Sequence, residues 1–395
     1  MGKLLVATTL YPNQVQFRHG IFVEARLRRL LAASDHRATV IAPVPWFPFT
    51  SQRFTRYAEY ARVPHVEQRH GIDIYHPRYL VVPKIGMLLT PLFLAWAMWR
   101  QLRAIERDGD RFDVIDAHYY YPDGVAAAIL ARVCRLPLLI TARGTDINVI
   151  AKMRVPGALM RWAARTAHCS IAVSAALQQT MCDVGFPATR VRVLRNGVDL
   201  QHFQPPSTAA SERDRPGKQI KLLSVGNLIE LKGHDLVVEA LTMLDECTLT
   251  IVGDGPLRDT LEQQARECGV ADRVYFVGAV DQARLVELYG EADMLVLASS
   301  REGMPNVVLE AMACDTPVVA TNVGGVPEIM LAPEAGVLLA RRDAAAIAEG
   351  VRRLREHYPS IGATRKYAEQ FSWDRTIDEL RVLIDAVTVS AGEQS

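Results

Sequence analysis

The sequence alternates between short apolar runs of strand length and longer helical runs, and it does so in two successive series. The first series holds expected strands at residues 4–8, 39–42, 114–117, 138–141, 170–173 and 191–194. The second holds expected strands at residues 220–225, 249–252, 274–277, 294–297 and 318–320. Strands that alternate with helices form parallel sheets. The pattern therefore predicts an α/β protein with two Rossmann-like, doubly wound parallel-sheet domains.

A polar, proline-bearing stretch separates the two series. We place an N-terminal domain at residues 1–203, a linker at 204–219 and a C-terminal domain at 220–371, with a last helical segment at 372–395. Open parallel sheets bind ligands at the carboxyl ends of their strands. Two such domains that face each other predict a ligand cleft in which both sets of strand ends converge.

Composition is typical of a globular protein, with 49% hydrophobic and 23% charged residues in 395. Residues 1–10 read as a first strand rather than a secretion signal, which predicts a cytoplasmic protein. The six cysteines lack metal-ligand spacing, so we expect reduced thiols and no metal site. The arginines are not interleaved with stacking aromatics, and this argues against nucleic acid as a partner.

Charge is distributed unevenly along the chain. Residues 1–203 hold 26 Lys and Arg against 14 Asp and Glu, a balance of +12; the remainder holds 19 against 30, a balance of −11. A basic first half predicts contact with anionic lipid or a phosphorylated acceptor, and charge complementarity between docked domains is the alternative.

Residues 85–99, IGMLLTPLFLAWAMW, are uncharged and are followed by RQLRAIER. They are too few to span a bilayer. Thr90 and Pro91 predict an N-cap and first helical position of an amphipathic helix. The helix is expected to be buried in the domain, with a peripheral contact to the inner membrane through its tryptophans as the alternative.

One stretch carries the most specific chemistry, REGMPNVVLEAMACDTPVVATNVGGVPE at residues 301–328. A loop with Glu302 precedes an apolar helical run that should begin near Asn306, and Glu310 lies about one turn inside it. A helix start suits a phosphate, while the two glutamates offer acceptors to hydroxyl groups on either side. The helix start and the two glutamates together favour a nucleotide sugar as ligand. The simpler alternative is that the glutamates only complement the helix dipole.

This stretch resembles the donor site of retaining glycosyltransferases of the GT-B fold, in the large family four (group 1). Residues 20–26, GIFVEAR, resemble a subgroup of this family associated with cell-surface polysaccharides. The resemblance implies that Glu310 accepts from the ribose hydroxyls and Glu302 from hydroxyls of the transferred sugar. It also implies that the backbone of Asn306 and Val307 meets the distal phosphate. Asp315 stands where relatives have glycine, and we expect it to affect a turn.

Other positions of the N-terminal half match the same family. Gly20 opens a helix where a phosphate or sugar would approach the backbone, although a simple turn also explains it. His118 ends a strand, and the resemblance implies contact with the donor sugar. In TARGTDIN, Arg143 and Asp146 would bind the acceptor, with an internal Arg143–Asp146 ion pair as the alternative. Relatives carry a histidine near Arg143.

In the C-terminal half, Gly226 follows the first strand and Lys232 precedes a helix. Lys232 is expected to neutralise the departing pyrophosphate, as a fixed cation in place of a metal. Asn227 stands where relatives often have arginine. Gly278 belongs to a strip that resembles the backbone that reads the nucleobase. In the family, the last helix packs back on the first domain.

The resemblance implies a retaining enzyme, and the sequence predicts that it is independent of metals and has no cofactor. It would transfer a sugar from a nucleotide-sugar donor to a hydroxyl of a glycan or lipid-linked acceptor, in the synthesis of cell-surface polysaccharide or glycolipid. The alternatives are a nucleotide-sugar epimerase or hydrolase on the same fold, or a catalytically silent scaffold of a polysaccharide assembly system.

Overall fold

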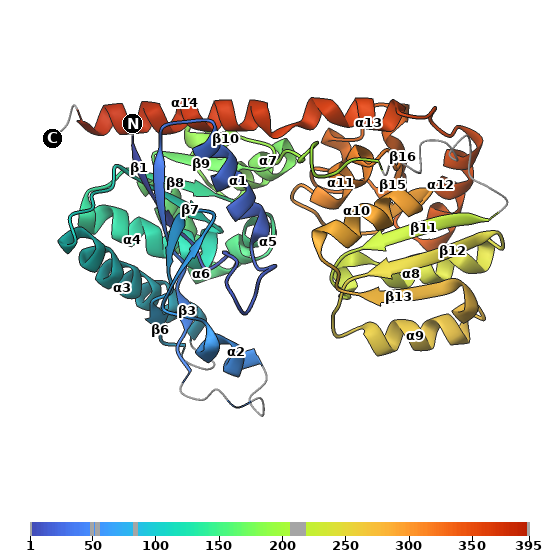
Figure 1. Ribbon diagram of the computed structural model, residues 1–395, viewed down its shortest axis with the longest axis horizontal. Coiled ribbons are helices and arrows are strands. Elements are labelled where there is room, and N and C mark those ends of the chain that lie inside the picture. Colours follow the sequence, from blue (N-terminus) through green and yellow to red (C-terminus); the bar gives the residue numbers. More distant parts are fainter. Residues whose placement is uncertain (1, 48–50, 52–55, 82–85, 206–218, 393–395) are drawn as a thin grey trace. The chain divides into compact units, whose positions relative to one another are not determined.

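The computed structural model describes residues 2–47, 51, 56–81, 86–205 and 219–392. The chain divides into two compact units (Figure 1). Unit 1 comprises Met1–Arg195 together with Asp374–Ser395, and unit 2 comprises Asn196–Trp373. Each unit is built on its own sheet and is described separately.

Unit 1 contains an eight-stranded sheet in the order β10-β9-β8-β7-β1-β2-β5-β4. Its pairs are parallel except the hairpin β4–β5. A two-stranded sheet of β3 and β6 accompanies it. The strands are β1 Lys3–Ala7, β2 Arg37–Ile41, β3 Val44–Pro45, β4 Val66–Arg69, β5 Ile72–Tyr75, β6 Arg78–Tyr79, β7 Val114–His118, β8 Leu138–Thr141, β9 Cys169–Ala172 and β10 Val191–Val193.

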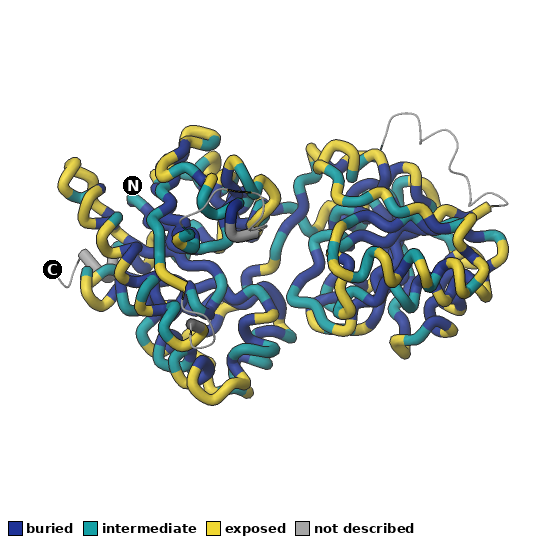
Figure 2. The backbone as a smooth tube through the Cα atoms, turned by 90° about the horizontal axis from the view of Figure 1, so that it is seen from below, coloured by how far each residue is buried: buried dark blue, intermediate teal, exposed yellow. Residues whose placement is uncertain are grey.

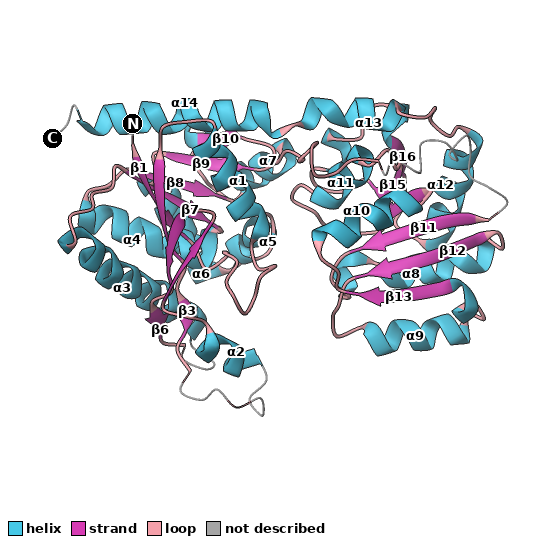
Figure 3. Ribbon diagram, in the orientation of Figure 1, coloured by secondary structure: helices cyan, strands magenta, loops and turns pink. Residues whose placement is uncertain are grey.

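The central strands of this sheet are buried, because helices pack on them (Figures 2 and 3). Helix α1 contributes Val23 and Leu27 to a cluster with Val6 of β1 and Val40 of β2, and α4 contacts β7 and β8. The α-helices of unit 1 are α1 Ile21–Ala32, α2 Arg56–Arg62, α3 Gly86–Arg107, α4 Val125–Cys134, α5 Thr145–Asn148, α6 Arg154–Thr166, α7 Ala175–Asp183 and α14 Trp373–Gly392, whose first residue belongs to unit 2.

Unit 2 contains a six-stranded parallel sheet in the order β13-β12-β11-β14-β15-β16. Its strands are β11 Ile220–Val225, β12 Cys247–Val252, β13 Val274–Gly278, β14 Met294–Leu297, β15 Val318–Thr321 and β16 Gly336–Leu339. Its α-helices are α8 His234–Ala240, α9 Arg258–Glu267, α10 Gln282–Glu291, α11 Asn306–Ala313, α12 Ala344–Glu356 and α13 Ala363–Ala368.

The order of the strands identifies the ligand-binding edge of each sheet. In unit 1 the direction of winding reverses between β1 and β7, and in unit 2 it reverses between β11 and β14. Loops that leave the carboxyl ends of such strands diverge and open a crevice. The segments that follow β1, β7, β11 and β14 are therefore the segments positioned to bind a ligand.

Every strand expected from the sequence is present within two residues, and the doubly wound architecture is confirmed. The hairpin β4–β5 was not expected. Its two-residue turn is His70–Gly71, and both residues have positive φ, 51° and 77°. A turn of this kind normally carries asparagine or aspartate followed by glycine. The histidine at its first position is the reason that the sequence did not predict the hairpin.

The boundary between the units lies at Arg195 rather than at residue 203. Residues beyond it pack on unit 2: Val198 donates its N–H to the Phe371 carbonyl, and the Arg365 guanidinium donates to the Leu200 carbonyl at 2.6 Å. Residues from Asp374 onward belong to unit 1, where Thr376 Oγ1 donates to the Arg195 carbonyl at 2.8 Å. Most of the expected linker, 206–218, lies outside the described residues.

Helix α3 begins at Gly86, so the expected start at Thr90 and Pro91 is wrong. Pro91 lies inside the helix. A proline lacks the N–H that would bond the carbonyl four residues earlier, which here belongs to Met87. That carbonyl accepts a hydrogen bond from the Tyr121 hydroxyl instead. Across the described residues, no helix is both long and apolar enough to cross a membrane.

Candidate functional site

A lysine and a glutamate meet where the sheet of unit 2 reverses direction. Lys232 ends a short 3-10 helix in the segment after β11, and Glu302 lies in the segment after β14. Lys232 Nζ is 2.6 Å from Glu302 Oε1. Ser299 Oγ donates to the same oxygen at 2.7 Å. The carboxylate is thus held by two donors, and the ammonium is fixed at the carboxyl edge of the sheet.

Gly226 makes room for the stem of Lys232. Its φ is 156°, close to the extended range, and a Cβ at this position would lie 3.3 Å from Lys232 Cδ. The next segment packs equally closely, since a Cβ on Gly253 would lie 2.0 Å from the Gly226 carbonyl oxygen. Gly253 N–H in turn donates to the Gly278 carbonyl at 2.9 Å. The backbone after β11, β12 and β13 therefore forms one contiguous edge that includes both Gly226 and Gly278.

The turn after β15 supports the Glu302 segment from its other side. Gly324 has φ +54°, and a Cβ there would lie 1.9 Å from the Glu302 carbonyl oxygen. Gly325 N–H donates to the Gly303 carbonyl at 3.0 Å. Only glycine at 324 permits this approach, so the backbone of Glu302 is held from two directions.

Helix α11 begins at Asn306 as expected. Its N-cap is Pro305, whose side chain offers no capping oxygen. The first N–H groups of a helix have no partner within it, and here they belong to Asn306 and Val307. The Asn306 side chain accepts a hydrogen bond from Asn196 Nδ2 at 3.0 Å. The N–H groups of Asn306 and Val307 thus have no partner within the helix, and their contact with the distal phosphate stays a prediction.

Glu310 is half-buried on α11. Tyr289 OH donates to Glu310 Oε2 at 3.0 Å. Burial raises the pKa of Glu310 to about 7, although the hydrogen bond from Tyr289 opposes the shift. A carboxyl with this pKa is half protonated near neutral pH, and it becomes a pure acceptor only as pH rises further. Asn227, by contrast, is exposed.

His118 of unit 1 lies in a buried network at the end of β7. Its side chain is 1% exposed. Arg143 Nη2 is 2.6 Å from His118 Nδ1, and His118 Nε2 is 3.4 Å from Asp116 Oδ2. Arg26 Nη2 reaches the same carboxylate oxygen at 2.6 Å. An arginine can only donate, and Arg26 Nη2 also lies 3.2 Å from His118 Nε2. Because the Arg143 contact is the shorter one, we assign the tautomer in which Nδ1 accepts from Arg143 and Nε2 carries the proton facing Asp116.

The charges of this network hold the histidine neutral. Burial lowers the pKa of His118 to about 3, and the Arg26 charge adds to the effect against the opposing charge of Asp116. Burial also lowers the pKa of Arg143 to about 9, which leaves it charged at neutral pH. Burial would raise the pKa of Asp116, but the charge of Arg26 and the hydrogen bonds from Arg26 and His118 prevail and lower it. His118 therefore has no nitrogen positioned to act as a general base here.

The carboxylate of Asp146 accepts hydrogen bonds from the protein's own backbone. It is fully buried, and its oxygens accept the backbone N–H groups of Tyr120 at 2.8 Å and Gly144 at 2.8 Å. It also accepts the backbone N–H of Arg143 at 3.1 Å, while the Arg143 guanidinium lies over the Phe22 ring at 4.7 Å. Asp146 therefore stabilises this turn, and its expected contact with an acceptor stays a prediction.

Gly20 is a turn residue in the structure. It caps α1 with φ +72°, and a Cβ would lie 2.2 Å from the Leu10 carbonyl oxygen. The space left by the missing Cβ is thus occupied by the protein's own backbone. Its contact with a donor phosphate stays a prediction.

Several residues of these edges were not singled out in the sequence. Arg26 and Asp116 hold His118; Ser299 and Tyr289 hold the two glutamates. Asp123 accepts from Thr9 N–H at 2.6 Å, and burial raises its pKa to about 7. Their partners lie far away in sequence, so no local spacing reveals them. Only Arg26 could have been noticed in the sequence, because it is a charged residue between apolar residues of an expected helix.

Asp315 has a structural explanation. Its φ is +62°, a left-handed conformation that favours glycine. Its side chain accepts the backbone N–H groups of Gly362 at 2.7 Å and Arg365 at 3.0 Å, at the start of α13. Asp315 therefore caps a neighbouring helix, and its charge is used away from Glu302 and Glu310.

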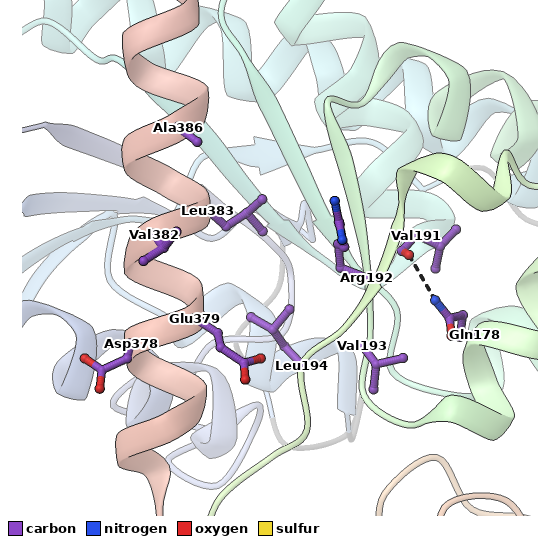
Figure 4. A pocket seen from close by; sticks show the side chains of 10 residues that line it. All are labelled: Gln178, Val191, Arg192, Val193, Leu194, Asp378, Glu379, Val382, Leu383 and Ala386. Atoms are coloured by element: carbon purple, nitrogen blue, oxygen red, sulfur yellow. Dashed lines mark hydrogen bonds between the residues drawn. The ribbon is translucent and has the colours of Figure 1, made fainter.

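A cavity of about 780 Å³ lies elsewhere in unit 1, between the edge strand β10 and α14 (Figure 4). Apolar side chains such as Leu194 and Val382 line it, with Asp378 and Glu379 among its other lining residues. No residue predicted for the site lines this cavity. Within the described ranges, no group of three or more His, Cys, Asp or Glu side chains is arranged to hold a metal ion.

Two Rossmann-like units, each with charged side chains gathered where its sheet reverses, define the class of GT-B glycosyltransferases. The family model "Glycosyltransferase Family 4" matches residues 23–202, and "Glycosyl transferases group 1" matches residues 208–371. The chain belongs to this family of group 1 glycosyltransferases, and it is a glycosyltransferase enzyme.

Individual relatives agree with this assignment. A Bacillus subtilis (strain 168) protein, assigned as the teichuronic acid biosynthesis glycosyltransferase TuaC, is 31% identical over 366 residues, covering 89% of this chain and 88% of its own. Sucrose-phosphate synthase from Thermosynechococcus elongatus shares the fold with a TM-score of 0.81 at 21% identity, over 98% and 99% of the two chains. HepE from Anabaena, solved with UDP, has a TM-score of 0.72 at 20% identity, over 98% and 100%.

Proposed function

We propose that the enzyme is a retaining, metal-independent glycosyltransferase. It moves a sugar from a nucleotide-sugar donor to a hydroxyl of a glycan or lipid-linked acceptor. The observation that carries the proposal is the Lys232–Glu302 pair, 2.6 Å apart, at the reversal of the unit 2 sheet. This pair puts a cation for the leaving diphosphate next to an acceptor for sugar hydroxyls.

The donor roles follow from charge and hydrogen bonding. The first N–H groups of α11, at Asn306 and Val307, would bind the distal phosphate, since helix starts favour anions. Glu310 would accept the ribose hydroxyls in its ionised form. Lys232 would stabilise the charge that develops on the departing diphosphate. HepE has been solved with UDP-glucose, so UDP-glucose is the first donor to test.

In unit 1, we assign binding roles to two further polar side chains, His118 and Arg143. Burial and the charges of Arg26 and Arg143 lower the pKa of His118 and keep the imidazole neutral, and its contacts with Arg143 and Asp116 fix its orientation. A rigid, neutral imidazole suits the contact with the transferred sugar that the family resemblance implies. Arg143 would meet an anionic group of the acceptor, since a guanidinium binds phosphate and carboxylate bidentately.

The reaction breaks the bond between the anomeric carbon and the diphosphate oxygen. The acceptor oxygen bonds to the same face of that carbon, and its proton passes to the leaving diphosphate. TuaC, assigned to teichuronic acid biosynthesis, supports a cell-surface polysaccharide or glycolipid as the product. The six cysteines are all free thiols, which supports a cytoplasmic location in this proposal.

The proposal is tested by product analysis. The purified enzyme is incubated with UDP-, GDP- and ADP-sugars, with and without a panel of glycan and lipid-linked acceptors. Proton NMR of the product should show the anomeric configuration of the donor, and nucleoside diphosphate should be released only when acceptor is present. Inverted product would contradict retention. Donor that changes without acceptor would favour an epimerase or hydrolase.

Metal independence is tested in the same assay. Because Lys232 supplies the cation for the diphosphate, the rate after treatment with EDTA should equal the rate with added Mg²⁺. A rate that is lost in EDTA and restored by Mg²⁺ would contradict this part of the proposal.

A further inference from the structure

Helix α3 of unit 1 presents an apolar stripe to solvent. Its inner face is buried through Leu94, Met98 and Leu102, and the helix packs on α4. On the outer face, Leu92 is 56% and Trp96 is 53% exposed. Residues four apart lie on one face of a helix. The helix is therefore apolar on two sides, and only one of them is covered.

The same outer face becomes basic toward the end of the helix. Beyond Trp96 it continues with exposed Trp99, Arg100, Arg103 and Arg107. The Arg100 guanidinium lies over the Trp96 ring, 4.8 Å from its centre. Arg103 pairs with Glu106 at 2.8 Å. The stripe thus runs in order from aliphatic side chains through two indoles to three guanidinium groups.

Neighbouring elements carry exposed residues of the same two kinds as the stripe. Near its start, β6 contacts α3, and exposed Leu80 and Val81 follow β6. On its covered side, α3 packs on α4. The C-terminal end of α4 adds exposed Arg132, Val133 and Arg135. Figure 1 shows α3 beside α4 in unit 1.

We propose that the outer face of α3 binds the surface of an anionic lipid bilayer. Leu88 and Leu92 would enter the boundary of the acyl chains, and Trp96 and Trp99 would lie at the level of the headgroups. The arginines that follow would contact lipid phosphates. Because the opposite face of α3 is packed on α4, the helix lies on the bilayer with its N-terminal half deeper.

Charge favours a bilayer over a protein partner as the occupant. Residues 1–203 carry 26 basic and 14 acidic side chains, a balance of +12. Such an excess attracts an anionic surface over several ångströms. Indoles between an apolar stripe and guanidinium groups match the change of polarity across a lipid headgroup layer. This proposal goes beyond the proposed reaction and does not rest on it, since lipid binding is measured without donor or acceptor.

Sedimentation with sucrose-loaded vesicles tests the proposal. The full chain should bind vesicles of three parts phosphatidylcholine to one part phosphatidylglycerol, bind phosphatidylcholine alone weakly, and lose affinity as salt increases. The double variant Leu92→Ser with Trp96→Ser should reduce binding at least tenfold. Arg100→Gln with Arg103→Gln should reduce binding to anionic vesicles by about fivefold per arginine, with little change on neutral ones.

Matched variants control for unrelated effects. Leu331→Ser replaces a residue that is 77% exposed in unit 2, and Arg375→Gln replaces a side chain that is 85% exposed in α14. Neither should change vesicle binding. Because all substituted side chains are solvent-exposed, circular dichroism should show native folding throughout. Brominated phosphatidylcholine should quench tryptophan fluorescence, and Trp96→Phe should remove much of that quenching.

Two results would overturn the proposal. One is the absence of binding to anionic vesicles, or binding that survives both double variants. The other is a dimer of the wild-type chain in sedimentation velocity that Leu92→Ser with Trp96→Ser abolishes, because a second copy would then be the occupant of this face.

Discussion

Lys232 Nζ lies 2.6 Å from Glu302 Oε1, and the two side chains are 21% and 11% exposed. They come from segments 70 residues apart that leave neighbouring strands of the unit 2 sheet. A partly buried ammonium that retains access to solvent can exchange its carboxylate contact for a diphosphate. The pair thus keeps the cation in place before the donor binds.

Removal of this cation should affect turnover most. Lys232→Ala should lower kcat by about a hundredfold to a thousandfold, since a preorganised charge on a leaving group has effects of that size. Steady-state kinetics with saturating acceptor measures it. Lys366→Ala, at an exposed lysine of α13, is the control and should leave kcat unchanged. A Lys232→Ala enzyme with normal kcat would remove Lys232 from the mechanism.

Donor binding should depend on pH through Glu310. Its pKa is raised to about 7, so the carboxyl is largely neutral below that pH and ionised above it. Ribose hydroxyls need an acceptor, and UDP-glucose has no phosphate that titrates in this range. Its dissociation constant should therefore be about tenfold larger at pH 6 than at pH 8.

The control for this pH dependence is Glu310→Gln, which cannot titrate. It should bind UDP-glucose weakly and with nearly constant affinity over the same range, as measured by calorimetry. An equal slope in the wild type and the variant would assign the titration to another group.

Gly324→Ala should disturb the Glu302 segment. The new Cβ would lie 1.9 Å from the Glu302 carbonyl oxygen at a residue with φ +54°. We expect a lower melting temperature and weaker donor binding, measured by thermal denaturation and calorimetry.

The matched control for this substitution is Gly362→Ala. Gly362 has φ +78°, and a Cβ there would meet no described atom within 4 Å beyond its chain neighbours. The variant should lose only about 1–2 kcal/mol in the free energy of unfolding, the cost of a left-handed conformation for alanine. Its donor binding should be unchanged. Equal donor binding in both variants would contradict the supporting role of Gly324.

Asp116→Asn should destabilise unit 1. Arg26 pairs with Asp116 at 2.6 Å, with side chains 5% and 3% exposed, and removal of one partner leaves a buried charge. The expected loss in the free energy of unfolding is about 3–5 kcal/mol, measured by urea denaturation. Arg375→Gln breaks the exposed Arg375–Glu379 pair and should cost at most about 0.5 kcal/mol. Similar losses in both variants would contradict the buried network.

Sequence reasoning located the strands and the start of α11 because both depend on local patterns. Apolar runs of strand length that alternate with helical runs predicted a doubly wound parallel sheet in each unit. Glu302, Glu310 and Lys232 were predicted from motifs that resemble the family, and their roles stay predictions. The hairpin β4–β5 escaped notice because its His70–Gly71 turn departs from the usual residues.

The supporting contacts could not be read from the sequence. Asp116 and Arg26 are 90 residues apart, and Asp146 is used by backbone N–H groups that only the folded turn brings to it. Asp315 looked like an unexplained charge until its contact with α13 was seen. Burial of Glu310, which sets its pKa, likewise depends on Tyr289 and the packing of α10 against α11.

The central claim is that the carboxyl edge of the unit 2 sheet binds the nucleotide of the donor. Isothermal titration of UDP, GDP and ADP into the wild-type enzyme and Glu310→Ala tests it most directly. We predict that one of the three nucleotides binds in preference to the others, and that Glu310→Ala weakens its binding at least tenfold while circular dichroism stays native. Absence of binding for all three, or equal affinity in Glu310→Ala, would contradict the account.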